Sequence, residues 1–171
     1  MLALLAQYYE SSLIIIEPSD YRRKTAKQMF PDACVINPDF ENPVNAIMHK
    51  TKGQGANTIF TACSVLKTHE QAILSVSKRG FVNFFGGLPK SAKEINILSN
   101  HIHYREAYIT GSHGSTPLQH KRALKMIAKK DIKLDKLISS KISLSDINQV
   151  FSNDHIKNNL KSIIKPELSA F

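Results

Sequence analysis

The chain has 171 residues, of which 42% are hydrophobic and 22% charged, and it contains no tryptophan. This composition is typical of a globular protein with a substantial core. No apolar run approaches the roughly 20 residues of a membrane span, and the N-terminus lacks the basic region and cleavage site of a signal peptide. Its two cysteines, Cys34 and Cys63, lie far apart in apolar stretches. We therefore expect a cytoplasmic protein without a membrane partner.

The net charge is +9, and the basic residues include clusters at residues 22–24, 120–122 and 129–130. Such clusters attract nucleic acid or an anionic cofactor such as a dinucleotide. No nucleic-acid-binding motif accompanies them, and solvated helix faces explain the charge more simply. A basic nucleic-acid-binding domain is therefore a minor alternative, and we expect no nucleic-acid partner.

The beginning of the chain is its most informative part. Residues 1–12 are typical of a short apolar helix, Leu13–Ile16 of a buried strand, and Glu17 follows directly before the turn Pro18–Asp20. A helix, a strand and an acid at the strand's end form the second half of a dinucleotide-binding βαβ unit. The first half, a strand and a G-x-G-x-x-G turn, is expected upstream of Met1 and is absent from this chain.

The middle of the chain alternates between helices and strands. We predict helices at Tyr21–Phe30, Pro43–Lys52 and Leu66–Ser77, the last ended by Lys78-Arg79-Gly80. We predict strands at Ala33–Ile36, Ala56–Cys63, Phe81–Phe85 and, after a loop, Tyr104–Thr110. This alternation indicates an α/β fold with a doubly wound parallel sheet.

The last third has a different pattern. An amphipathic helix is predicted at Pro117–Lys130, a short helix at Ile147–Ser152 and a final strand at Leu160–Pro166. We therefore divide the chain into an incomplete dinucleotide-binding domain, residues 1–115, and a helix-rich segment, residues 116–171, that ends in a strand.

Three predicted strands end on small or polar residues, at Thr61–Ser64, Phe85–Leu88 and Gly111–Gly114. Ligands of parallel sheets collect beyond the carboxyl ends of the strands, and glycine lets a flat ligand approach the backbone closely. Tight turns alone explain any one of these glycines. Their combination at one edge, together with Glu17, favours a ligand site.

Several motifs resemble one family when taken in order. They are Glu17-Pro18-Ser19 with Arg22, Gly53–Ala56, Phe85–Pro89, His103–Glu106 followed by Thr110–Ser112, and Leu160–Pro166. The chain resembles the C-terminal part, with the cofactor-binding domain, of a zinc-dependent medium-chain alcohol or polyol dehydrogenase of the sorbitol or threonine dehydrogenase type. The resemblance implies a Rossmann-like doubly wound sheet in the order 3-2-1-4-5-6 that lacks its first strand, with a C-terminal segment of the split catalytic domain.

The resemblance also implies the cofactor and its contacts. Glu17 would bind the adenosine ribose, which favours NAD without excluding NADP, and Arg22 would lie near the adenosine. Ala62 and Cys63 would flank the ribose on the adenine side, and Lys161 would reach the pyrophosphate. The nicotinamide would be lined by Phe85, Gly86, Gly87, Ser112 and Gly114.

No catalytic residue and no metal ligand is assigned to this chain. The family's zinc ligands belong to the region upstream of Met1, and no cysteine or histidine here matches their positions. His113 is expected to fill a turn, and His101 and His103 to pack at an interface between subunits.

Two functions remain from the sequence. In the first, the chain is the cofactor-binding portion of an NAD-dependent, zinc-containing oxidoreductase that transfers hydride from a secondary or polyol alcohol to NAD, and it is inactive alone. In the second, it is a non-catalytic truncated remnant or an interaction module. The resemblance further implies a homo-oligomer formed through the sixth-strand region. Strand edges left unpaired by the missing first strand predict low stability.

Overall fold

The computed structural model describes residues 1–91, 94–152 and 158–166, which form two compact units. Unit 1 comprises Met1–Asp39 and Thr116–Phe171, and unit 2 comprises Phe40–Ser115. The functional division predicted at residues 115 and 116 stays a prediction. No helix in the described ranges is long and apolar enough to cross a membrane.

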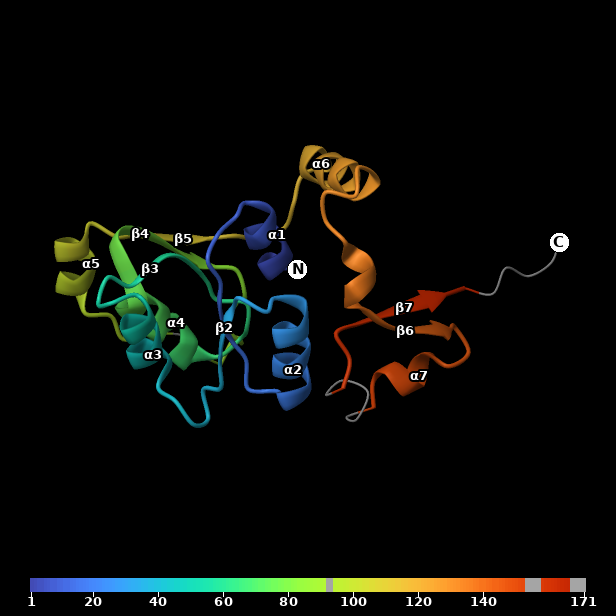
Figure 1. Cartoon of the computed structure of the whole chain (residues 1–171), viewed down its shortest axis with the longest axis horizontal. Coiled ribbons are helices and arrows are strands. Elements are labelled where there is room, and N and C mark those ends of the chain that lie inside the picture. Colours follow the sequence, from blue (N-terminus) through green and yellow to red (C-terminus); the bar gives the residue numbers. More distant parts are fainter. Residues whose placement is uncertain (92–93, 153–157, 167–171) are drawn as a thin grey trace. The chain divides into compact units, whose positions relative to one another are not determined.

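Unit 2 contains a three-stranded parallel sheet. Its strands are β3 (Ala56–Phe60), β4 (Val76–Phe84) and β5 (Tyr108–Gly111), with β4 in the middle. Its helices are α3 (Pro43–Lys50), α4 (Leu66–Ser75) and α5 (Ser99–Arg105) (Figure 1). Asn42 begins α3, because its side chain accepts hydrogen bonds from the backbone N–H groups of Val44 and Asn45.

The two faces of this sheet differ in character. Ile59, Val82 and Ile109 are aligned across the strands and belong to the core that includes Ala72 of α4. Since neighbouring side chains of a strand point to opposite faces, Phe81 and Tyr108 lie on the other face. Their rings stack with centroids 4.6 Å apart, and both remain about half exposed. One face of the sheet is therefore packed and the other is accessible within this unit.

Several predicted boundaries in unit 2 are wrong, including the end of the strand predicted to reach Cys63, which ends at Phe60. The strand predicted to begin at Phe81 begins at Val76, which is fully buried and paired with Ala56, so Lys78-Arg79-Gly80 does not end a helix. Arg79 adopts a left-handed φ of 57° within the strand, near the point where the register with β3 shifts. The burial of Val76 in the core outweighs the helix-stop pattern that follows it.

The strand predicted at Tyr104–Thr110 also begins later than expected. Its first part belongs to α5, which ends at Arg105 and is capped by Glu106 in a left-handed conformation with φ of 51°. The Arg105 guanidinium donates hydrogen bonds to the carbonyls of Val76, at 2.6 Å, and of Gln54, at 3.3 Å. These long-range bonds fix α5 against β4, which local sequence patterns do not reveal.

Unit 1 contains the beginning and the end of the chain. Its first elements are α1 (Leu2–Tyr8), β1 (Ile14–Ile16), α2 (Asp20–Met29) and β2 (Cys34–Ile36). Its later elements are α6 (Pro117–Ala128), the 3-10 helix η1 (Leu134–Leu137), β6 (Ile138–Ser143), α7 (Ile147–Val150) and β7 (Lys161–Lys165). Strands β1 and β2 are parallel, as are β6 and β7. The sequence analysis did not predict β6.

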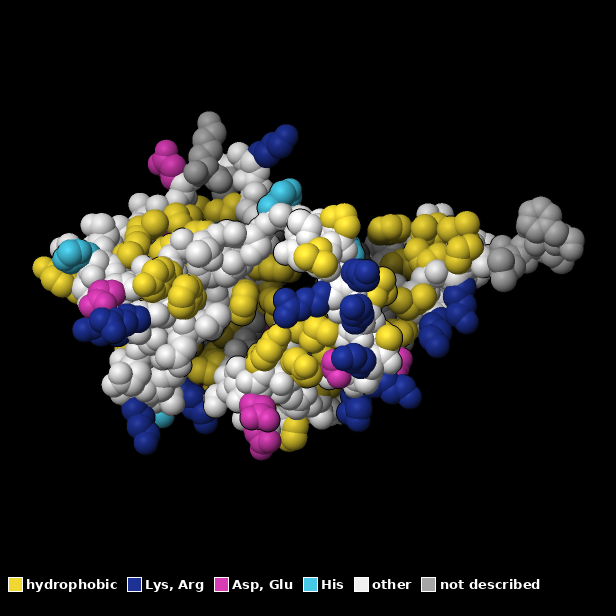
Figure 2. All heavy atoms as spheres, turned by 90° about the horizontal axis from the view of Figure 1, so that it is seen from above, with side chains coloured by type: hydrophobic (Ala, Val, Ile, Leu, Met, Phe, Trp, Pro, Cys, Tyr) yellow, Lys and Arg dark blue, Asp and Glu magenta, His cyan; other side chains and the backbone are white. Residues whose placement is uncertain are grey.

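Helix α6 has a strong start and an exposed surface. Thr116 and Gln119 form a reciprocal capping box, with Pro117 at the first helical position. Leu118, Leu124 and other apolar side chains of α6 are exposed. Lys and Arg side chains gather over α6 and the segments that follow it (Figure 2). The basic clusters at residues 120–122 and 129–130 are thus on the surface of unit 1.

The strand pairing agrees with the predicted order. The second and third strands of the resembled fold, β1 and β2, pair with each other, and the fourth to sixth, β3 to β5, form the other parallel sheet. Within the described ranges, β1 and β3 belong to separate sheets. The structure confirms a mixed α/β fold built from parallel sheets.

Candidate functional site

Backbone hydrogen bonds bring three chain segments together at the carboxyl edge of the unit 2 sheet. The Thr61 N–H donates to the Asn83 carbonyl at 3.1 Å, and the Gly86 N–H donates to the Thr61 carbonyl at 2.6 Å. The Ser112 N–H donates to the Phe84 carbonyl at 3.2 Å. Seven of the ten predicted site residues follow these strand ends: Ala62, Cys63, Phe85, Gly86, Gly87, Ser112 and Gly114.

The two neighbouring glycines after β4 have different surroundings. A Cβ atom on Gly86 would lie 2.7 Å from the Cys63 carbonyl oxygen and 2.9 Å from the Cys63 nitrogen. A Cβ atom on Gly87 would have nothing within 4 Å. Gly86 is therefore required by the close approach of two backbone segments, whereas Gly87 borders open space that a ligand can enter.

An amide side chain orders the end of β5. The Ser112 hydroxyl donates to Asn83 Oδ1 at 2.9 Å, and Asn83 Nδ2 donates to Thr110 Oγ1 at 3.1 Å. Asn83 lies inside β4, and the sequence analysis did not identify it. An asparagine within an apolar strand is the signal that points to it, because a strand interior rarely contains this residue without a partner.

Three side chains in the loop after β3 and in α4 complete this edge. The Cys63 thiol is exposed and lies 3.2 Å from Thr68 Oγ1. The buried Thr61 hydroxyl has no hydrogen-bond partner within the part of the chain that the structure describes. His69, which is only 4% exposed, places Nε2 3.1 Å from the Gly86 carbonyl oxygen. The sequence analysis missed His69, which belongs to no recognisable motif.

The remaining three predicted site residues belong to unit 1. Glu17 follows β1, and its Oε1 accepts a hydrogen bond from the Ser19 N–H at 2.9 Å. The Arg23 guanidinium donates to the Glu17 carbonyl at 3.1 Å and also to the Pro18 carbonyl. Arg22 lies in the first turn of α2. The carboxylate of Glu17 is thus held at the carboxyl end of β1.

Lys161 is the exposed first residue of β7. Burial, and then the positive charge of Lys161, hold the pKa of the Met1 amino group below its ordinary value. Lys161 therefore acts electrostatically on the beginning of α1.

A known protein family matches most of this chain. The family model described as zinc-binding dehydrogenase matches residues 1–129. The chain belongs to this family.

Relatives with known names are dehydrogenases. The chain is 34% identical over 105 residues to L-threonine 3-dehydrogenase of Thermococcus kodakarensis, an alignment that covers 59% of this chain and 29% of that protein. It is 30% identical over 152 residues to scyllo-inosose 3-dehydrogenase of Thermotoga maritima, covering 85% of this chain and 37% of that protein. The chain therefore spans only about a third of the length of these relatives.

Solved structures share the fold. Benzyl alcohol dehydrogenase from Acinetobacter calcoaceticus superposes with a TM-score of 0.84 at 22% identity, over 95% of this chain and 45% of that chain. A protein of Sinorhizobium meliloti, described as a zinc-binding dehydrogenase and bound to NADP, gives a TM-score of 0.83 at 24% identity, over 95% of this chain and 48% of that chain. The predicted family and fold are confirmed.

The described residues offer no zinc site of their own. Among residues 1–91, 94–152 and 158–166, no three His, Cys, Asp or Glu side chains lie close enough to hold a metal ion.

His101, in α5, has its Nε2 buried without a partner among these residues. Burial first, and then the charge of Arg105, lower the pKa of His101.

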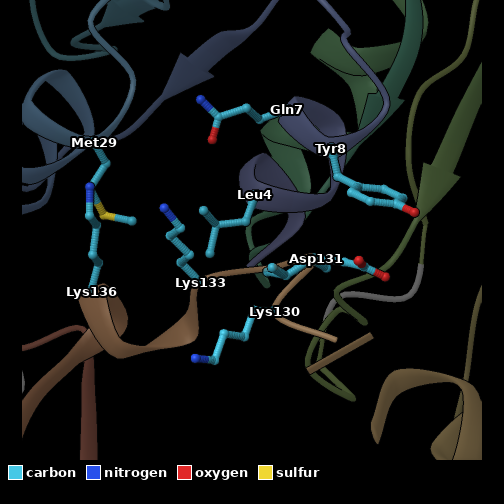
Figure 3. Close-up of a pocket in the computed structure, with 9 residues that line it drawn as sticks. Leu4, Gln7, Tyr8, Met29, Lys130, Asp131, Lys133 and Lys136 are labelled. Atoms are coloured by element: carbon cyan, nitrogen blue, oxygen red, sulfur yellow. The ribbon is translucent and has the colours of Figure 1, made fainter. Parts of the chain in front are cut away.

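Unit 1 also contains a cavity of about 330 Å³. Its lining residues are Leu4, Gln7, Tyr8, Met29, Lys130, Asp131, Ile132, Lys133 and Lys136. Figure 3 shows the Lys133 and Lys136 side chains pointing into the same space as Leu4 and Met29. None of the ten predicted site residues lines this cavity, so it is separate from the strand-end site.

Proposed function

We propose that this chain is the cofactor-binding portion of a zinc-containing, NAD-dependent dehydrogenase that oxidises a secondary alcohol or polyol. The observation that carries the proposal is the edge where β3, β4 and β5 end, with Gly87 and Gly114 beside open space. Parallel sheets bind nucleotides beyond such an edge. Membership of the zinc-binding dehydrogenases supports this choice over an interaction module.

The nicotinamide end of the cofactor is proposed to lie against unit 2. Phe85, Gly86 and Gly87 would line it from the end of β4, and Ser112 and Gly114 from the end of β5. Main-chain groups of these turns are suited to a carboxamide, which both donates and accepts hydrogen bonds. The nicotinamide supplies hydride acceptance when it is bound. Ala62 and Cys63 would contact the ribose on the adenine side.

For the adenosine end, we propose contacts with Glu17, Arg22 and Lys161. Glu17 would accept hydrogen bonds from the ribose hydroxyls, since the Ser19 N–H occupies only one of its carboxylate oxygens. Arg22 would lie near the adenosine and Lys161 near the pyrophosphate. A carboxylate repels the 2′-phosphate of NADP, which favours NAD.

The substrate is proposed from the relatives. Two of them are named for acting on L-threonine and scyllo-inosose, and both names support a hydroxyl on a secondary carbon.

Because the described residues lack a metal site, we propose that the polypeptide has no dehydrogenase activity alone. Turnover with NAD, zinc and a panel of polyols, above that of a heat-inactivated sample, would contradict this.

Calorimetric titration of the chain with NAD and NADP tests the cofactor choice. We expect weak binding of NAD and still weaker binding of NADP. Glu17→Gln removes the negative charge and should reduce the preference for NAD by roughly tenfold or more, about 1.4 kcal/mol. Asp32→Asn, which is exposed in the turn before β2, removes a negative charge at the opposite edge of the same strands and is the matched control. Equal binding of both cofactors by the unmodified chain would refute the role of Glu17.

We further propose self-association and a reducing compartment. Strand β5 pairs only with β4 among the described strands, so its other edge is available to a second copy. Light scattering that gives a monomer at micromolar concentration would reject self-association.

The proposed location is the cytoplasm. Cys34 and Cys63 are free thiols, which supports a reducing compartment. The other proposed partner is a small alcohol or polyol substrate, and we propose no nucleic-acid or membrane partner.

A further inference from the structure

Gly86 is held by three contacts, one at its N–H, one at its α-carbon and one at its carbonyl. The Gly86 N–H donates to the Thr61 carbonyl at 2.6 Å. The α-carbon of Gly86 lies against the Cys63 backbone, where a Cβ atom would be only 2.7 Å from a carbonyl oxygen. The Gly86 carbonyl faces His69 Nε2 at 3.1 Å. These contacts fix the orientation of Gly86, although the next residue, Gly87, borders open space.

His69 is suited to this contact by its own packing. Its side chain is 4% exposed, and its ring stacks on Phe84 with a centroid distance of 4.3 Å and an interplanar angle of 12°. Because a carbonyl oxygen only accepts hydrogen bonds, Nε2 carries the hydrogen. The stacking fixes the plane of the ring, and the ring fixes the direction of the Gly86 carbonyl.

The orientation of that carbonyl determines the orientation of the next N–H. In a planar trans peptide the C=O of one residue and the N–H of the next point in opposite directions, and the structure has no cis peptide among its described residues. The Gly86 carbonyl points inward to buried His69, so the Gly87 N–H points outward. Within the described chain, the Gly87 N–H donates to no other group, and Gly87 borders open space.

We propose that His69 is a positioning residue that holds the Gly86–Gly87 peptide so that the Gly87 N–H is presented to the carboxamide of the bound nicotinamide. The identity of this ligand rests on the proposed function. The orientation of the peptide does not, because it follows from the contacts of Gly86 alone. His69 therefore acts on the cofactor through the turn and touches no reacting atom.

Two substitutions separate the hydrogen bond from the packing. His69→Phe keeps an aromatic ring against Phe84 and removes the donor. His69→Gln removes the ring and keeps an N–H donor at a similar distance from the backbone. His49→Phe, at the exposed end of α3, is the matched control. If His69 only packed, the glutamine variant would be the more damaging of the two.

The first measurement is the backbone amide signals of Gly86 and Gly87 in ¹H–¹⁵N NMR spectra of the whole chain without ligand. We expect His69→Phe to shift both signals strongly, and His69→Gln and His49→Phe to leave them near their original positions. The reverse order, or no shift in His69→Phe, would overturn the proposed orientation.

The second measurement compares NAD with AMP, which lacks the nicotinamide. We expect His69→Phe to weaken NAD binding about tenfold, which is about 1.4 kcal/mol, and to change AMP binding less than twofold. His69→Gln should restore most of the NAD affinity. If the unmodified chain binds neither compound, the proposed function fails together with the ligand part of this proposal, while the amide signals still decide the role of His69 in the turn. Equal loss of NAD and AMP binding in His69→Phe would overturn the positioning role.

Discussion

The two glycines after β4 provide a matched pair of substitutions. Gly86→Ala places a methyl group 2.7 Å, 2.9 Å and 3.0 Å from three backbone atoms of Cys63. Backbone atoms cannot rotate away as a flexible side chain does, so either β4 or the loop after β3 must move. Overpacking of this kind costs about 1–3 kcal/mol. The same change would lengthen the hydrogen bond between the Gly86 N–H and the Thr61 carbonyl.

Gly87→Ala is the control, because its methyl group meets nothing within 4 Å. Its φ lies outside the left-handed region, so alanine is tolerated there. The free energy of unfolding should stay the same or rise by up to about 1 kcal/mol, because alanine restricts the unfolded chain. Thermal unfolding followed by circular dichroism measures both variants.

For a chain of this size, 1 kcal/mol corresponds to roughly 2–4 °C in Tm. We expect Gly86→Ala to lower Tm by about 2–12 °C, and Gly87→Ala to leave Tm unchanged or raise it by up to about 4 °C. If both variants unfold at the temperature of the original chain, the contact between Gly86 and Cys63 does not exist and the assembly of the site edge is wrong.

Three further predictions concern stability. The pKa of His101 is lowered by burial, so the unfolded chain binds a proton before the folded chain as pH falls below about 6.5. The free energy of unfolding in urea should therefore decrease below this pH, and His101→Gln should reduce the decrease. The same pH dependence in His101→Gln would contradict the burial of His101. Arg105→Met removes the hydrogen bonds to the Val76 and Gln54 carbonyls and should lower the free energy of unfolding by about 1–3 kcal/mol. The control Arg122→Met, at an exposed position, should leave the free energy of unfolding unchanged. Amide hydrogen exchange should be faster in the three-residue strands β1 and β2 than in β4, which is bonded on both sides; equal rates would refute the separation of the two sheets.

The local patterns predicted most of the α/β core. The strands predicted at residues 13–16, 33–36 and 56–63 are found at residues 14–16, 34–36 and 56–60, because β-branched and apolar runs between turn residues favour buried parallel strands. The capped starts of α3 and α6 were also recognisable, since Asn42 and Thr116 stand directly before a proline.

The errors arise where distant contacts decide the structure. Val76 continues a helical pattern but pairs with Ala56 of β3, and α5 is held by Arg105 through carbonyls of β4 and of the turn before β3. Strand β6 depends on pairing with β7, which lies about twenty residues further along the chain. A single sequence without this pairing information predicts such elements poorly.

The turns of the candidate site could be predicted from the sequence, but the side chains that hydrogen-bond to these turns could not. Glycines at strand ends favour a ligand site, so Gly87 and Gly114 could be proposed from their type and position. The structure explains Gly86 instead by the close approach of the Cys63 backbone. His69 and Asn83 act through Gly86 and Ser112, which are 17 and 29 residues away in sequence. Their roles depend on the assembled sheet, which no local motif encodes.

NMR titration of the ¹⁵N-labelled chain with NAD tests the central claim most directly. The account predicts progressive shifts at millimolar NAD for the amides of residues 61–63, 85–87 and 112–114, which follow the three strand ends, and for Glu17 after β1. Unchanged spectra, or shifts confined to Lys130, Lys133 and Lys136 around the cavity of unit 1, would contradict a dinucleotide site at the carboxyl edge of the sheet.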